Sequence, residues 1–210
     1  LIHIVRFVGQ QNKVKQKVLK YFKEEIENHI RYGDPSIESE LKSIWEEDYV
    51  PTTRKMRAQF SKYMSGCDDV GWDRIWSEAK RLIDDKEISV YSVNGKSDDV
   101  LLYKNHEGKP FNVIVIGGDK LSRGLTLEGL TVSYFTRSSN TYDTLMQMGR
   151  WFGFRSGYLD ACRLFTTPTL YASFSHISMA TEDLAAQFDF MNSVVQTPKD
   201  FGLRVASHPT

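Results

Sequence analysis

The fold is decided by residues 111–155, which read FNVIVIGGDKLSRGLTLEGLTVSYFTRSSNTYDTLMQMGRWFGFR. The stretch opens with an apolar run closed by Gly117-Gly118, the pattern of a strand that is buried on both faces of a parallel sheet. A second strand is expected over residues 130–135, and a helix is expected to start near Tyr142 after a polar loop. The basic residues of the stretch are therefore expected at the carboxyl edge of a parallel sheet, where open α/β folds bind ligands.

Strand and helix patterns alternate on both sides of this stretch. The other expected strands are residues 1–8, 88–93 and 162–166. After residue 8, apolar residues recur every four positions and predict a long amphipathic helix that ends at Gly33-Asp34-Pro35. Thr167-Pro168 is a start signal for a last long helix. This alternation predicts an α/β fold with a parallel sheet flanked by helices.

Residues 35–86 interrupt the alternation with three helical patterns, the second of which is expected to begin at Pro51. We interpret them as a helical insertion, so that one domain comprises residues 1–34 and 87–210. The tryptophans of the insertion are expected to fill a small core of its own, with stacking on nucleic-acid bases as the alternative. These are Trp45, Trp72 and Trp76.

The composition is that of a globular protein. The net charge of zero gives no global basic field, so any nucleic-acid binding has to use a local groove. No apolar run approaches the roughly 20 residues that span a bilayer, and no signal peptide is apparent. Cys67 and Cys162 lack metal-ligand spacing and are expected to be reduced thiols in a cytoplasmic protein. The chain starts without Met in a strand-like run, and we expect it to be part of a longer polypeptide.

Two segments resemble motifs of ATP-dependent motors. LSRGLTLEGL, residues 121–130, resembles motif V of superfamily-two helicases and translocases, and QMGRWFGFR, residues 147–155, resembles their arginine-bearing motif VI. Together with LIHIVRF at the start and TPKDFGLRV near the end, these two segments resemble the Z-one domain family more closely than they resemble helicases in general. This family is a helicase-related group described as endonucleases of bacterial restriction and phage-defence loci. The resemblance covers most of the chain and implies a RecA-like sheet of the P-loop-NTPase type, the second lobe of a helicase core.

The resemblance also implies catalytic residues. Arg150 matches the first arginine of motif VI, Arg155 best matches the second, the arginine finger, and Gln147 matches the glutamine that often precedes the Gly-Arg pair. Four residues separate the two arginines here, whereas the motif has two, so which arginine contacts the γ-phosphate stays open. A salt bridge at a solvated helix end is the alternative role of each arginine.

Motif V implies contacts on two sides of the lobe. Arg123-Gly124 match the motif and are expected to approach the nucleotide, whereas Thr126 replaces the acidic residue of many helicases, so ribose recognition differs or is lost. Backbone N–H groups and cations near the glycine turn can contact phosphates of DNA, and the contacts expected on this basis are Gly117, Gly118 and Lys120. Arg6, at the end of the first expected strand, lies where the resemblance implies motif IV and is a further expected nucleic-acid contact. A tight strand exit for the glycines and simple exposure for the arginine are the alternatives.

Two other patterns do not support chemistry. Residues 94–97 end like a P-loop but lack its first glycine, which is expected five positions before Gly95. Glu78 and Lys80 resemble the Glu-x-Lys of a nuclease, but they lie on the solvated face of an expected helix. No histidine spacing indicates a metal site.

The leading hypothesis is a C-terminal motor lobe of an ATP-dependent, DNA-acting helicase or translocase of a bacterial restriction or phage-defence system. Such a lobe supplies arginines to an ATP site that it shares with an N-terminal P-loop lobe of the same polypeptide, which holds most of the ATP and Mg²⁺. The chain alone is then expected to be inactive, and other defence-system subunits are candidate partners. The alternatives are a degenerate DNA- or protein-binding module without catalysis, and an endonuclease domain.

Overall fold

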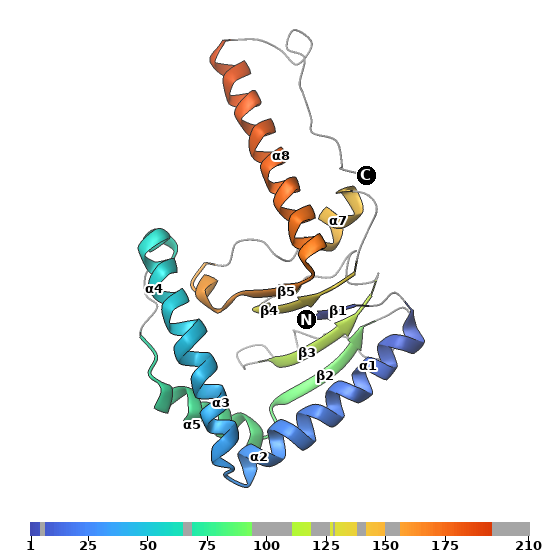
Figure 1. The fold of residues 1–210 in the computed structure, drawn as a ribbon, viewed down its shortest axis with the longest axis vertical. Coiled ribbons are helices and arrows are strands. Elements are labelled where there is room, and N and C mark those ends of the chain that lie inside the picture. Colours follow the sequence, from blue (N-terminus) through green and yellow to red (C-terminus); the bar gives the residue numbers. More distant parts are fainter. Residues whose placement is uncertain are drawn as a thin grey trace.

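In the computed structural model, five strands form one sheet in which every neighbouring pair is parallel, in the order β2-β3-β1-β4-β5 (Figure 1). The structure describes residues 1–4, 7–64, 69–93, 111–118, 127, 129–137, 142–149 and 156–194. The strands are β1 (Ile2–His3), β2 (Ile88–Val93), β3 (Asn112–Gly117), β4 (Val132–Phe135) and β5 (Arg163–Thr166). Helices flank the sheet, so the predicted α/β class is confirmed, and the arrangement is compatible with a RecA-like fold.

The first strand lies in the middle of the sheet. Ile2 is in register with Ile116 of β3 on one side and with Tyr134 of β4 on the other. The chain continues from β1 to the β2 edge, returns to β3 and crosses to β4 and β5 on the far side. In open parallel sheets such a change of direction opens a crevice at the carboxyl ends of the central strands.

The prediction of a strand over residues 1–8 was wrong in its length. β1 ends at His3, and helix α1 already begins at Val8 with Phe7 as an extended N-cap. A central strand is only as long as its partners allow, and His3 is in register with Phe135, the last residue of β4.

One face of the sheet is covered by a long helical run, as Figure 1 shows for α1. The run consists of α1 (Val8–Tyr21), a π-helical segment η1 (Phe22–Glu27) and α2 (Asn28–Arg31). It ends at Gly33, whose φ of 71° suits glycine and confirms the predicted stop.

On the other face, two helices pack against the carboxyl end of β4. They are α7 (Tyr142–Gly149) and α8 (Pro168–Ser193). Phe135, Leu145, Leu170 and Ile177 form a buried cluster that joins them to the sheet. The Thr167 side chain accepts a hydrogen bond from the Leu170 N–H at 3.2 Å, which confirms the predicted start of α8. Its distal part extends beyond the sheet (Figure 1).

Most of the described residues between 35 and 86 are helical, as predicted, but the first two expected helices are one continuous run. Its parts are α3 (Pro35–Ile44), the π-helical η2 (Trp45–Tyr49) and α4 (Val50–Gln59), followed by the 3-10 turn η3 (Ser61–Tyr63) and then α5 (Trp72–Asp84). Pro51 does not start a new helix, because a wider π turn precedes it, in which the Val50 N–H donates to the Trp45 carbonyl. Such a turn accommodates a residue without an N–H inside a helix.

The predicted tryptophan core is correct for two of the three residues. Trp72 and Trp76 stack at 5.9 Å and belong to a buried cluster with Ile30, Ile37 and Ile83. Trp45 is not in that cluster and stacks instead on its neighbour Tyr49 at 5.7 Å. The cluster also contains Ile30 of α2 and Ile88 of β2, so the helical segment packs in a core that it shares with the sheet. The division of the chain into two domains stays a prediction. No helix among the described residues is long and apolar enough to cross a membrane.

Candidate functional site

The carboxyl edge of the sheet is the site that the sequence indicates. Gly117 ends β3, and Gly118 follows in a bend. Both glycines are buried, so a close-packed strand exit accounts for the pair. Their predicted contact with a nucleic-acid backbone stays a prediction.

Beside the glycines, the edge carries a histidine and an arginine that the sequence analysis missed. His3 is fully buried, and its ring meets the Phe135 ring edge-on at a centroid distance of 5.2 Å. The Thr136 N–H donates to the His3 carbonyl at 3.2 Å, and Arg137 Nη1 lies 3.4 Å from His3 Nε2. The edge therefore holds a half-buried guanidinium between β1 and β4. The place of Arg137 just after the strand predicted over residues 130–135 was the available signal, whereas His3 lay inside the longer strand predicted over residues 1–8.

Among the α7 side chains that the structure describes, Leu145 attaches the helix to the sheet. Leu145 is 1% exposed and packs in the cluster around Phe135, whereas Met146 is 52% exposed. Gln147 is also exposed, so its amide faces away from the packed side of the helix. An amide in this position is accessible to a partner that approaches the edge.

The other predicted site residues lie outside the described residues. They are Arg6, Lys120, Arg123, Gly124, Thr126, Arg150 and Arg155. The chain leaves β3 at Gly118, before the motif V segment, and Leu127 within that segment packs against Val93 of β2 and Val115 of β3. Leu127 therefore holds this part of the segment against the sheet. The motif VI arginines follow directly after α7, which ends at Gly149.

Several carboxyl groups at the ends and on the faces of the helices have lowered pKa values. The hydroxyl and N–H of Ser36 lower the pKa of Asp34 to about 2, and a hydrogen bond from Arg163 lowers the pKa of Asp48. Glu78 accepts hydrogen bonds from Arg81 on the exposed face of α5, which lower the pKa of that carboxyl. These shifts arise from caps and ion pairs of the helices. No cluster that could hold a metal ion is found in the part of the chain that the structure describes.

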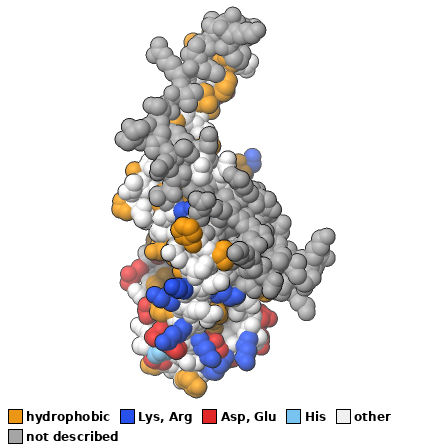
Figure 2. All heavy atoms as spheres, turned by 90° about the vertical axis from the view of Figure 1, so that its right-hand side faces the viewer, with side chains coloured by type: hydrophobic (Ala, Val, Ile, Leu, Met, Phe, Trp, Pro, Cys, Tyr) orange, Lys and Arg blue, Asp and Glu red, His pale blue; other side chains and the backbone are white. Residues whose placement is uncertain are grey.

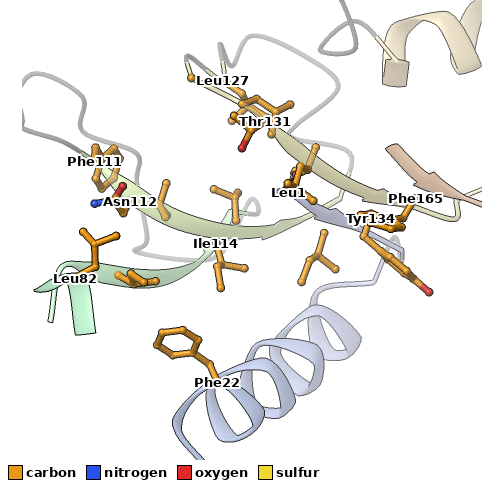
Figure 3. Close-up of a pocket in the computed structure, with 17 residues that line it drawn as sticks. Leu1, Phe22, Leu82, Phe111, Asn112, Ile114, Leu127, Thr131, Tyr134 and Phe165 are labelled. Atoms are coloured by element: carbon orange, nitrogen blue, oxygen red, sulfur yellow. Dashed lines mark hydrogen bonds between the residues drawn. The ribbon is translucent and has the colours of Figure 1, made fainter. Parts of the chain in front are cut away.

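A separate cavity of about 680 Å³ lies around the amino ends of β3 and β4, lined by residues on both sides of the sheet and by Phe22 of the helical run. Figure 3 shows Phe22 reaching from the helix toward the sheet, with Tyr134 and Phe165 at the other end of the cavity. Its walls are largely apolar, and both of these aromatic side chains are about half exposed. The cavity is therefore open, and it lacks the cationic donors that the carboxyl edge offers through Arg137.

Comparison with known proteins identifies one family. The family model described as the Z1 domain matches residues 1–210, the whole chain. No curated protein and no solved structure matches significantly. The chain therefore belongs to the Z1 domain family.

Proposed function

We propose that this chain is the C-terminal motor lobe of an ATP-dependent, DNA-acting helicase or translocase-like protein of a bacterial restriction or phage-defence system. One observation carries the proposal. The segment that resembles motif V, residues 121–130, follows the end of strand β3 within a few residues, and the segment that resembles motif VI, residues 147–155, begins in α7, the helix packed against the carboxyl end of β4. Membership of the Z1 domain family and the all-parallel sheet are consistent with this role.

The donors of the carboxyl edge suit a phosphate ligand. Arg137 contributes a guanidinium and Gln147 an exposed amide, groups that bind phosphate oxygens. Bound ATP supplies the phosphoryl group, and Mg²⁺ neutralises part of its charge, both held mainly by an N-terminal P-loop lobe. In this proposal Arg150 and Arg155 add the cation that faces the charge developing at the γ-phosphate.

The test is ATP hydrolysis by the full-length parent protein, with and without DNA, in the wild type and the Arg150→Ala variant. Loss of an arginine finger lowers turnover by about 10³-fold or more. Arg54→Ala is the matched control, because Arg54 is an exposed arginine of α4, outside both motifs, and its loss should leave turnover unchanged.

Each outcome separates the candidate functions. Turnover that survives Arg150→Ala but not Arg155→Ala assigns the finger to the second arginine. A well-folded parent without any turnover contradicts the motor and favours a DNA- or protein-binding module, an alternative that the four-residue arginine spacing and Thr126 already suggest. Metal-dependent cleavage of DNA by the chain itself would instead support an endonuclease.

A further inference from the structure

Helix α1 has two chemically different faces. Its inner face packs against β2 and β3 and contains Gln11, which is 1% exposed, with Val14 and Val18 half-buried. Phe22 continues this stripe into η1 and lines the cavity under the sheet. The apolar side of the helix is therefore already used within the fold.

The outer face consists mainly of glycine, amide and lysine residues, with two apolar side chains in the last turn. The exposed residues of α1 are Gly9, Gln10, Asn12, Lys13, Gln16, Lys17, Leu19, Lys20 and Tyr21. The three lysines recur at i, i+4 and i+7, the spacing of one side of a helix. Between Val8 and Lys23 there are five lysines and no acidic residue, although the whole chain has a net charge of zero. The row ends where Lys20 forms an exposed ion pair with Glu24 at 3.7 Å.

The position of α1 joins this lysine row to the candidate site. The helix starts shortly after β1, at the carboxyl edge of the sheet, and its first turn contains no acidic side chain. The positive end of the helix dipole therefore has the same sign as the lysines. Figure 2 views the molecule from the side on which α1 lies, and it shows Lys and Arg side chains gathered on the lower part of that face, with Asp and Glu among them.

We infer that the outer face of α1 binds the sugar-phosphate backbone of DNA without reading its sequence. This inference rests on the proposed DNA-acting function and names a surface for it. Lys13 and Lys20 are seven residues apart, which is about 10 Å along a helix. One strand of B-DNA presents about three phosphates over that length, one for each lysine of the row. The amides of Gln10 and Gln16 add neutral donors to phosphate or sugar oxygens.

An anionic membrane is the less suitable partner. Amphipathic helices bind bilayers by inserting an apolar face beneath their basic residues. Here the valines of α1 face β2 and β3, and the exposed apolar side chains of the helix, Leu19 and Tyr21, are confined to its last turn, so they form no continuous face to insert. Contact with phosphates of DNA requires only the ammonium and amide groups that this face presents.

The experiment measures binding of the chain to a fluorescent 20-base-pair duplex and to the matching single strand at several salt concentrations, without ATP. The test variant is K13Q/K17Q/K20Q, which removes three charges while keeping residues of similar helix propensity. The control is K42Q/K55Q/K62Q, three exposed lysines of the helical segment. Circular dichroism and thermal melts of all three proteins establish that the fold is retained.

The α1 variant should bind DNA roughly 10- to 100-fold more weakly at low salt, and the slope of log K against log[salt] should fall by about 0.7 to 0.9 per lysine. The control should keep most of its affinity. Equal losses in both variants, or an unchanged salt slope in the α1 variant, would overturn the inference. So would lysine-dependent binding to phosphatidylserine vesicles without binding to DNA. The binding assay involves neither ATP nor Arg150. A failure of the DNA-binding inference is therefore seen in this assay, whereas a failure of the motor proposal is seen in the assay of ATP hydrolysis.

Discussion

The packing of α7 leads to a quantitative prediction for the Leu145→Ala variant. Leu145 is 1% exposed and lies between Phe135 of β4 and the α8 residues Leu170 and Ile177. The substitution removes three carbons, each contributing about 0.8 kcal/mol of burial, or roughly 2.4 kcal/mol together. The cavity left behind adds to this loss, so we expect a total destabilisation of about 3–4 kcal/mol.

Met146→Ala is the matched control on the same helix. Met146 is 52% exposed, so its truncation should cost about 1 kcal/mol or less. Urea unfolding followed by circular dichroism measures both variants. With a slope of about 3 kcal/mol per M, the Leu145→Ala midpoint should fall by about 1 M and the Met146→Ala midpoint by roughly a third of that or less.

Hydrogen exchange gives the second readout. If Leu145 holds α7 on the sheet, the amides of residues 142–149 should exchange faster in the Leu145→Ala variant than in the Met146→Ala variant. Equal midpoints for the two variants, or equal exchange in α7, would refute the packing argument. In the full-length parent, the motor proposal adds that ATP turnover falls only in the Leu145→Ala variant, because Arg150 directly follows this helix.

Three further changes test contacts outside α7. Arg163→Gln removes a guanidinium that lies 4.2 Å from the Tyr49 ring centroid and donates to Asp48 at 2.8 Å. Because the Asp48 side chain is about half exposed, the substitution should lower the free energy of unfolding, measured in urea, by about 1 kcal/mol. Thr167→Ala should cost about 1 kcal/mol in the same assay through loss of the α8 cap, and Thr167→Ser should restore most of it. Asp34→Ala should be less stable than the wild type near neutral pH. Because folding lowers the pKa of Asp34 from 3.8 to about 2, its stabilisation is complete above about pH 4 and disappears as the pH falls through 2, so melts of the two proteins should converge over that range.

Elements whose signals are local were predicted well from the sequence. The apolar run before Gly117 predicts β3, and the glycine that ends the first helical run has the positive φ that its position requires. Thr167 and Pro168 predict the start of α8, because the cap and the fixed φ of proline act within a single turn. Each of these signals depends on neighbouring residues alone.

Features that depend on distant partners were not predicted. The length of β1 is set by the register of His3 with Phe135, which is 132 residues away in the sequence. The arginine of the edge, Arg137, was passed over for the same reason, since its neighbour His3 comes from another strand. Trp45 was assigned to the wrong core because helical periodicity identifies an apolar face without identifying its partner.

The net charge of zero illustrates the same distinction between local and spatial information. A phosphate responds to charges within about one Debye length, roughly 10 Å at 0.1 M salt, and not to the sum over the chain. Lys13, Lys17 and Lys20 lie within that distance along one exposed helix face, whereas the nearest acidic residue in the sequence, Glu24, stands at the end of their row. Zero net charge is therefore compatible with a strong local positive field. The arrangement of lysines on α1, rather than the composition, indicates where a polyanion is expected to bind.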